Sequence, residues 1–272
     1  MNASYIELTY GQVGVAALLI LVSGAVSVAL RLGMERSLLV AGVRTVVQLL
    51  LVGLVLEWVF RVSRWYTVIA LMIVMTVVAG ATAAGRTERT YPGIWISAIV
   101  SVWASSWLIT AFALFAVIQG MDRWYQPQYA IPLLGMVLGN TLNGVSLGLN
   151  TLTETLALRR DEVDAQLALG ATRWEAARAP VRHAVRVGMI PIINAMTIVG
   201  IVSLPGMMTG QLLSGIPPIQ AVKYQIVIMF LIASATALGT VGVVLLSYRR
   251  LFNADHQFLY HRLDVSKRSK RG

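Results

Sequence analysis

The sequence has no cysteine and few charged residues. The absence of cysteine excludes disulfide bonds and thiolate metal sites. Charged residues make up only 12% of the 272 positions, while 57% are hydrophobic, and the mean hydropathy is +0.73. A soluble domain of this length carries roughly twice as much charge. The composition therefore predicts an all-α, polytopic membrane protein whose spans are helices.

Several enzyme motifs are missing as well. Neither G-x-x-x-x-G-K-[ST] nor the dipeptide Gly-Lys occurs, so the chain has no P-loop for ATP, and H-E-x-x-H is also absent. Residues 144–148 match the G-x-S-x-G string of serine hydrolases, but all three histidines lie outside the predicted spans, so Ser146 lacks a base. We expect no catalytic residue and no cofactor on this chain. If ATP drives it, ATP and Mg must bind another subunit.

Long apolar runs account for most of the chain. About 20 apolar residues cross a bilayer. Seven segments meet this length, namely residues 10–30, 37–59, 66–84, 94–119, 129–152, 187–205 and 224–247. The first residues, MNASYIELTY, lack the basic start of a cleavable signal, so the first run is expected to remain as a span.

The basic residues predict the orientation of these spans. With the N-terminus outside, the cytoplasmic segments hold 17 of the 22 lysine and arginine residues, and the outer segments hold four. The predicted cytoplasmic segments are residues 31–36, 85–93, 153–186 and 248–272. The positive-inside rule therefore favours an N-out, C-in topology. The net charge of +10 is explained by this topology, and no nucleic acid partner is expected.

The largest predicted cytoplasmic loop carries charge between two long apolar segments. Asp161 is expected to cap a short helix that has Asp164 at its third position and ends at Gly170, because glycine accepts the left-handed conformation. Thr172 and Glu175 fit a T-x-x-E capping box, which predicts a second short helix. Two short helices joined at a glycine would form a rigid knob that can receive force from a soluble partner. The alternative is a hairpin that only connects two spans.

This loop resembles the EAA-type coupling loop of ABC transporter permeases. The matching residues are DA at 164–165, LGAT at 169–172 and EA at 175–176, with Gln166 in place of the second alanine. Three further strings are similar to the FetB family of permeases: RTxxQL at 44–49, PLxGMxxGN at 132–140 and LPGMMTGQ at 204–211. The resemblance covers roughly residues 10 to 260.

The resemblance implies a single permease domain over residues 1–272, working with a separate ABC ATPase in a bacterial inner membrane. One chain offers one knob and ABC permeases present two, so a homodimer beside two ATPase chains is expected. The family is linked to iron export in bacteria, and plant relatives act in aluminium tolerance. Metal is therefore the expected cargo, with a sugar nucleotide or a lipid as alternatives. The residues expected to contact the ATPase are Glu162, Asp164, Gly170, Thr172, Trp174 and Glu175.

Polar side chains lie inside the second and fifth predicted spans, where they are costly in lipid. Arg44 and Gln48 are four residues apart and share one helix face, although Arg44 can also snorkel to the headgroups. Asn140 and Asn143 lie among two G-x-x-x-G pairs, which favour close helix packing. These amides either bond between helices or, with Arg44 and Gln48, line a cargo path.

The sixth predicted span contains Asn194 and breaks at Pro205. Such a break is tolerated where backbone lines a cavity or is buried in protein. Met207, Met208 and Gln211 follow it, and their thioethers and amide are possible cargo contacts. Adjacent methionines also simply fill irregular packing. The identity of any metal ligand stays open.

Two further features bear on mechanism and surroundings. Glu57, at the outer edge of its span, is the only carboxylate near a predicted span interior, which argues against a proton-coupled secondary transporter but leaves sodium coupling open. The tail HRLDVSKRSKRG, residues 261–272 at the end of the basic cytoplasmic segment 248–272, is expected to lie solvated beside anionic lipid and does not need to fold.

Overall fold

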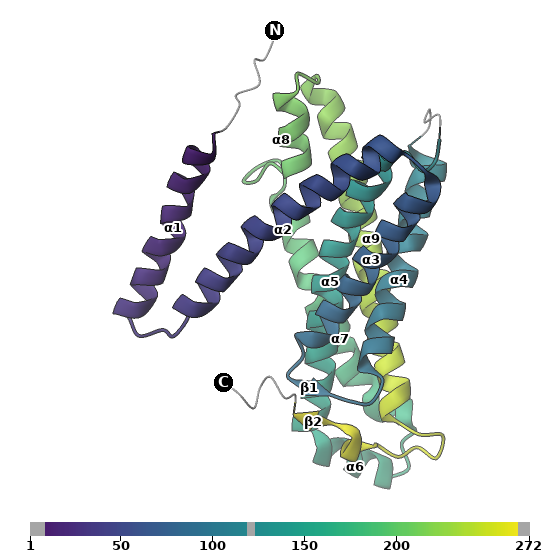
Figure 1. Ribbon diagram of the computed structural model, residues 1–272. Coiled ribbons are helices and arrows are strands. Elements are labelled where there is room, and N and C mark those ends of the chain that lie inside the picture. Colours follow the sequence, from purple (N-terminus) through teal and green to yellow (C-terminus); the bar gives the residue numbers. More distant parts are fainter. Residues whose placement is uncertain (1–8, 119–122, 266–272) are drawn as a thin grey trace.

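The computed structural model describes residues 9–118 and 123–265, and these residues are almost entirely helical (Figure 1). The elements in chain order are α1 (Tyr10–Ala29), α2 (Glu35–Val62), α3 (Trp65–Gly85), β1 (Arg89–Thr90), α4 (Ile94–Phe112), the π-helical turn η1 (Ala113–Val117), α5 (Pro127–Leu158), α6 (Arg160–Ala168), α7 (Arg173–Ile198), α8 (Gly206–Leu213), α9 (Pro218–Leu251), the 3₁₀ turn η2 (Tyr260–Arg262) and β2 (Asp264–Val265).

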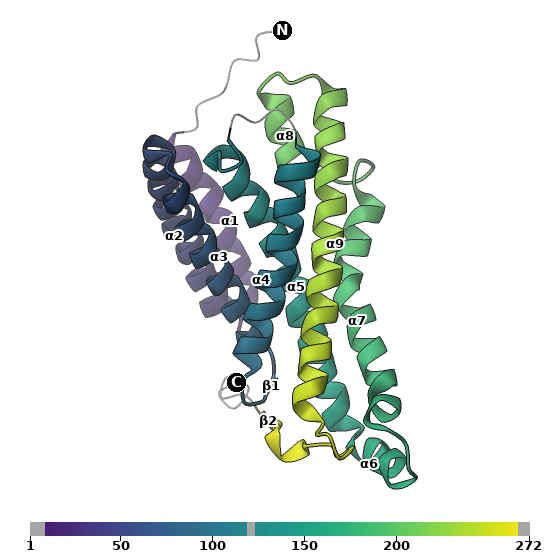
Figure 2. The same ribbon diagram turned by 90° about the vertical axis from the view of Figure 1, so that its right-hand side faces the viewer.

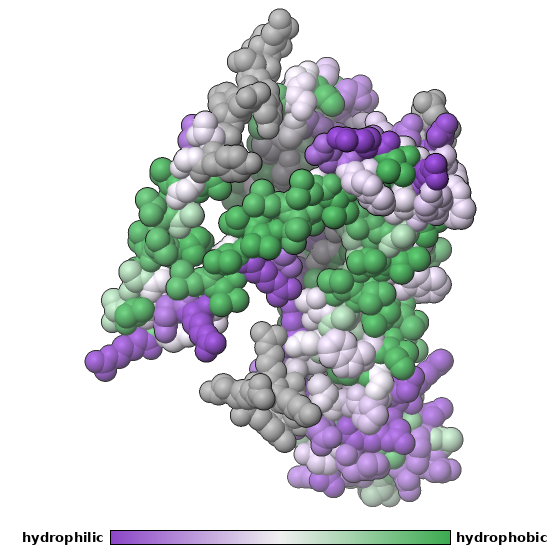
Figure 3. Space-filling view, viewed as in Figure 1, coloured by the Kyte–Doolittle hydropathy of each residue, from purple (hydrophilic) through white to green (hydrophobic). Residues whose placement is uncertain are grey.

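Six helices of the described residues are long and apolar enough to cross a membrane. They are α1, α2, α3, α4 with its π-helical extension, α5 and α9. A hydrophobic band covers α1, α2 and the middle of the bundle, while the end that carries α6 and the two strands is hydrophilic (Figure 3). The prediction of an all-α, polytopic membrane protein is confirmed. The count of seven spans and the N-out, C-in orientation stay predictions.

The expected span at residues 187–205 differs from the structure. Its first part is the end of α7, which stops at Ile198, and residues 199–205 form an irregular connection to α8. Pro191 lies inside α7 rather than at the boundary of a span. The break at Pro205 is present, because Pro205 is the N-cap of α8. Because its first half contains several arginines, α7 as a whole is not among the helices that are apolar enough to cross a membrane.

Helix α5 is the centre of the bundle and packs against α3, α4, α7 and α9. Its close approach to α9 requires glycine: a Cβ on Gly144 would lie 2.5 Å from Thr236 Cγ2 and 2.7 Å from Thr240 Oγ1. A Cβ on Gly188 of α7 would lie 2.8 Å from the carbonyl oxygen of Gly144. The close packing predicted for the pair Gly144 and Gly148 is confirmed, and Gly188 of α7 packs at the same crossing. In the other predicted pair, Gly135 and Gly139, the Cβ position of Gly139 has no atom within 4 Å.

Helices α1 and α2 form an arm that leaves the bundle (Figure 1). Helix α1 packs mainly against α2, and no residue in the most apolar stretch of α2 is buried. The side chains of this stretch are apolar, so lipid or a second protein surface must cover them in a membrane. In the described chain, α2 touches α3 and α5 only near its end.

The end of the bundle opposite α8 holds α6, β1 and β2 (Figure 2). Strand β2 pairs antiparallel with β1, which joins the C-terminal segment to the connection between α3 and α4. The predicted tail therefore folds as far as Val265: α9 continues to Leu251, and the residues after it contact the hairpin between α5 and α7. Residues 261–265 of the tail, which was not expected to need a fold, are therefore part of a folded segment. Residues 266–272 lie outside the described residues.

Candidate functional site

The hairpin between α5 and α7, here called the coupling tip (residues 159–176), projects from the hydrophilic end of the bundle (Figure 2). Its first helix, α6, begins at Arg160 and has no side-chain cap, so the predicted cap at Asp161 is wrong. Instead, the Arg159 guanidinium donates to both oxygens of Glu162, at 2.6 and 2.7 Å. Arg160 lies 3.3 Å from Asp164. These exposed pairs add little stability, but they order the first turn.

Gly170 ends the first helix of the tip, as the sequence predicts. Its φ of +92° lies in the left-handed region, and no atom lies within 4 Å of the position of a Cβ. Its amide donates to the carbonyl of Leu167 at 3.0 Å. Beside it, Leu169 is 88% exposed, although it is apolar. In the sequence, Leu169 was noted only as part of the LGAT string, and its exposure was not predicted. The signal that would have indicated it is an apolar residue next to a turn glycine.

The predicted capping box is present at the start of α7. Thr172 N–H donates to Glu175 Oε2 at 2.7 Å, and Glu175 N–H donates to Thr172 Oγ1 at 3.3 Å. The hydrogen bonds from the side chain and the backbone of Thr172 lower the pKa of Glu175 below its usual value. The box therefore depends on an ionised carboxylate.

The second helix of the tip is not short, which corrects the sequence prediction. Helix α7 continues without interruption from Arg173 to Ile198 and packs against α5 and α9 within the bundle. Trp174, which is 44% exposed, makes an edge contact with Tyr248 of α9 at 5.5 Å between ring centroids. A displacement of the tip therefore acts directly on a helix of the bundle.

Helix α5 carries a polar face made up of Asn140, Asn143 and Asn150, of which Asn143 is exposed and the other two are half-buried. Arg86, just after α3, donates to Asn143 Oδ1 at 2.9 Å, and the backbone N–H of Glu88 donates to Asn150 Oδ1 at 2.8 Å. Asn140 donates to the carbonyl of Met136 in its own helix. Asn143 lies halfway along α5, about 24 Å from each end at 1.5 Å per residue. The interhelical bond expected of an amide here is present for Asn143, and sequence reasoning missed its partner Arg86.

The other predicted cargo-path residues lie apart from Asn143. Arg44 and Gln48 lie on one helix, as expected, with exposed side chains that make no hydrogen bond or ion pair within the described chain. Asn194 is exposed on α7. Met207, Met208 and Gln211 are half-buried on α8, at the far end of the bundle (Figure 2), and Gln211 Oε1 has no partner among the described residues. The described residues contain no group of three or more histidine, aspartate or glutamate side chains suited to a metal.

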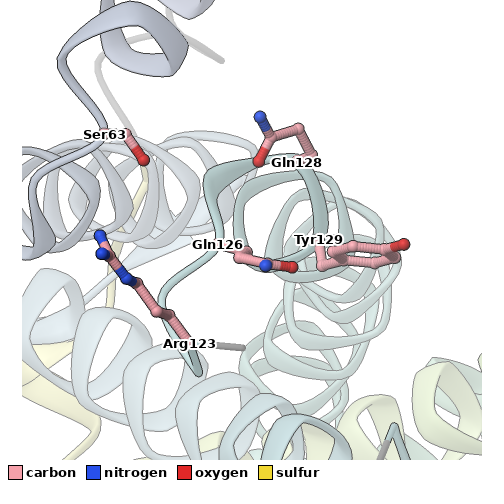
Figure 4. Close-up of a pocket in the computed structure, with 5 residues that line it drawn as sticks. All are labelled: Ser63, Arg123, Gln126, Gln128 and Tyr129. Carbon is pink, nitrogen blue, oxygen red and sulfur yellow. The ribbon is translucent and has the colours of Figure 1, made fainter. Parts of the chain in front are cut away.

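A polar pocket of about 630 Å³ lies where the turn between α2 and α3 approaches the start of α5. It is lined by Ser63, Arg123, Gln126, Gln128 and Tyr129 (Figure 4). The Arg123 side chain extends towards the side of the pocket that carries Ser63. The lining residues include no pair of nucleophile and base. Sequence reasoning missed this pocket because its residues come from separate connections.

Together these features define a class. A bundle of apolar helices, an exposed polar face at mid-helix and a hydrophilic hairpin tip describe a multi-pass membrane protein. The chain belongs to the uncharacterised protein family UPF0014, whose family model matches residues 10–252.

Its relatives include membrane proteins and a named permease. The chain is 37% identical to the UPF0014 membrane protein slr1647 of Synechocystis, over 95% of this chain and 100% of the relative. It is 29% identical to the probable iron export permease protein FetB of Escherichia coli, over 94% and 97%. It is 30% identical to the UPF0014 membrane protein STAR2 of rice, over 86% and 80%. No solved structure matches the chain.

Proposed function

We propose that the chain is the membrane-spanning permease subunit of an ABC transporter, which exports metal from a bacterial cell. The observation that carries this proposal is the coupling tip. Two helices meet at Gly170 with an exposed Leu169 beside it, and the second helix runs on into the bundle. A soluble ATPase that grips this tip would move α7 as one body. ATP and Mg bind to that ATPase, and the six tip residues named from the sequence contact it.

The exposed polar groups support the proposal of a homodimer. Arg44, Gln48, Asn143 and Asn194 are exposed in the single chain, on helices that cross or enter the bilayer. Such groups are costly in lipid, so they face protein or a water-filled path. A second copy placed against the polar face of α5 would cover Asn143 and enclose a cargo path between the two chains.

Iron is the proposed cargo because the relative FetB is named a probable iron export permease. The amide and guanidinium groups of the polar face do not select iron by themselves, and the metal ligands stay unassigned. A sugar nucleotide or a lipid is the alternative cargo for the same transporter. The chain is placed in the inner membrane, N-out and C-in, with 17 of its 22 basic residues inside.

Purification of the tagged chain with its partners, followed by transport in inside-out membrane vesicles, tests the proposal. We expect a P-loop ATPase in stoichiometric amount and ATP-dependent accumulation of radioactive iron in the vesicles. Accumulation that follows a sodium gradient without ATP would contradict the ABC mechanism. ATP-dependent activity without iron accumulation would reject iron and direct the search to the other cargoes.

A further inference from the structure

We propose that residues 252–265, here called the C-terminal clasp, transmit movement of the coupling tip to Arg86 and Asn143 on the polar face. This inference rests on the proposed function, because it takes the tip as the place where the ATPase acts. The clasp contacts the tip at one end and the connection between α3 and α4 at the other. It is therefore a second mechanical link, in addition to α5 and α7 themselves.

At the tip, the clasp holds both helices that flank Gly170. The backbone N–H of Arg173 donates to His256 Nδ1 at 2.9 Å, and its guanidinium donates to the carbonyl of Asn253, also at 2.9 Å. On α6, the guanidinium carbon of Arg160 lies 4.3 Å from the centre of the Tyr260 ring, which is a cation–π contact. A change in the angle between α6 and α7 must displace the clasp or break these contacts.

A chain of aromatic rings makes the clasp stiff. Successive ring centroids lie 5.5, 5.4, 5.1 and 6.1 Å apart, from α7 through the end of α9 to the clasp. The rings belong to Trp174, Tyr248, Phe252, Phe258 and Tyr260. Each such contact adds stability beyond that of the apolar area that it buries. The clasp therefore behaves as a folded part of the bundle end rather than as a loose tail.

At its other end, the clasp forms the only strand pairing between named strands in the described residues. Arg89 of β1 lies opposite Val265 of β2, and Thr90 lies opposite Asp264. Leu263, just before β2, is buried. A pair of two-residue strands is only marginally stable alone, so its stability depends on the packing of Leu263 beside it.

From β1, hydrogen bonds lead to the polar face. Arg86 is three residues before β1 and donates to Asn143, while the N–H of Glu88 donates to Asn150. The contacts form one continuous path: tip, aromatic rings, β2, β1, Arg86 and Asn143. Movement of the tip would thereby shift the guanidinium that lies on the proposed cargo path.

Two truncations test the clasp in the full complex with its ATPase. Ending the chain after Leu263 removes β2 together with residues 266–272, and ending it after Val265 is the matched control that keeps β2. We expect both to reach the membrane and retain the ATPase, while the shorter chain loses iron export by about tenfold or more, within the usual range of coupling between sites. The control exports normally.

The outcomes separate the two proposals. If both truncations retain the ATPase and export as the full chain does, the clasp inference is wrong and the proposed function stands. If the full chain recovers no ATPase, the proposed function fails, and the clasp inference fails with it.

A disulfide across the strands gives a second test that does not remove residues. Because the chain has no cysteine, Thr90→Cys with Asp264→Cys introduces a single pair at opposed positions, within the reach of a disulfide. If β1 and β2 move as one body, the double-cysteine variant should keep exporting when this pair is oxidised. The two single-cysteine variants should export as well. Loss of export on oxidation, with recovery on reduction, would show that the strands must separate and would overturn the inference.

Discussion

Gly170 is the residue at which the coupling tip changes direction. Its φ of +92° is strained for any residue with a Cβ, although there is open space around it. We predict that Gly170→Val destabilises this turn by about 1 kcal/mol or more. The chain should still reach the membrane, while recovery of the ATPase and iron export are lost.

Gly14→Val is the matched control for this change, because Gly14 also has nothing within 4 Å of its Cβ position but has no positive φ. It should retain ATPase binding. Normal recovery of the ATPase and normal export by Gly170→Val would show that the tip is only a connector between two helices.

Glu175 makes the start of α7 sensitive to acid. Its pKa is lowered by the hydrogen bonds from Thr172, so the folded pKa lies below that of the unfolded chain. The stabilisation by the capping box is therefore complete above the ordinary glutamate pKa of about 4.3 and is lost as the pH falls through the lower folded value. Hydrogen exchange over residues 169–176, corrected for the intrinsic rate, should stay constant from about pH 8 to 5 and rise towards pH 3. Glu175→Gln should remove this dependence, and an unchanged pH profile in that variant would contradict the assignment.

At the scale of elements, two local signals in the sequence predicted the structure correctly, while the local cap at Asp161 and the contacts between distant residues were not predicted correctly. The turn at Gly170 and the box at Thr172 depend on neighbours within four residues, so both could be predicted. The union of the tip with α7 could not be predicted, because the arginine-rich first half of that helix was assigned to the cytoplasmic loop and its apolar second half to a separate span at residues 187–205. Arg86 bonds to a residue 57 positions away, and Arg173 to residues 80 and 83 positions away. No periodicity within a segment reveals such contacts.

The crossing of α5, α7 and α9 gives a prediction about the bundle itself. A Cβ on Gly188 would lie 2.6 Å from Thr240 Cγ2 and 2.8 Å from the carbonyl of Gly144. Because one of these atoms is backbone, Gly188→Val forces the helices apart and should cost about 1–3 kcal/mol. Thermal unfolding in detergent measures the effect. Gly24→Val, at a position with open space, is the control, and equal melting temperatures for the two variants would contradict this packing.

At the scale of the whole molecule, the single chain leaves two surfaces uncovered. The α1–α2 arm has almost no buried surface, and the polar face of α5 is open. Composition predicted the helical membrane fold correctly, since charge and hydropathy are summed over the whole chain. The orientation, the second copy and the ATPase remain predictions, because they depend on surfaces that a single chain does not supply.

Photo-crosslinking from the coupling tip tests most directly whether the tip docks an ATPase. In this cysteine-free chain, Leu169→Cys labels one position that is 88% exposed at the tip, and Leu213→Cys labels a 66% exposed position on α8 at the other end. After modification with a benzophenone maleimide and illumination in membranes, the account predicts a crosslink from position 169 to a P-loop ATPase and none from position 213. A labelled chain that exports normally but gives no ATPase crosslink from position 169 would contradict the account.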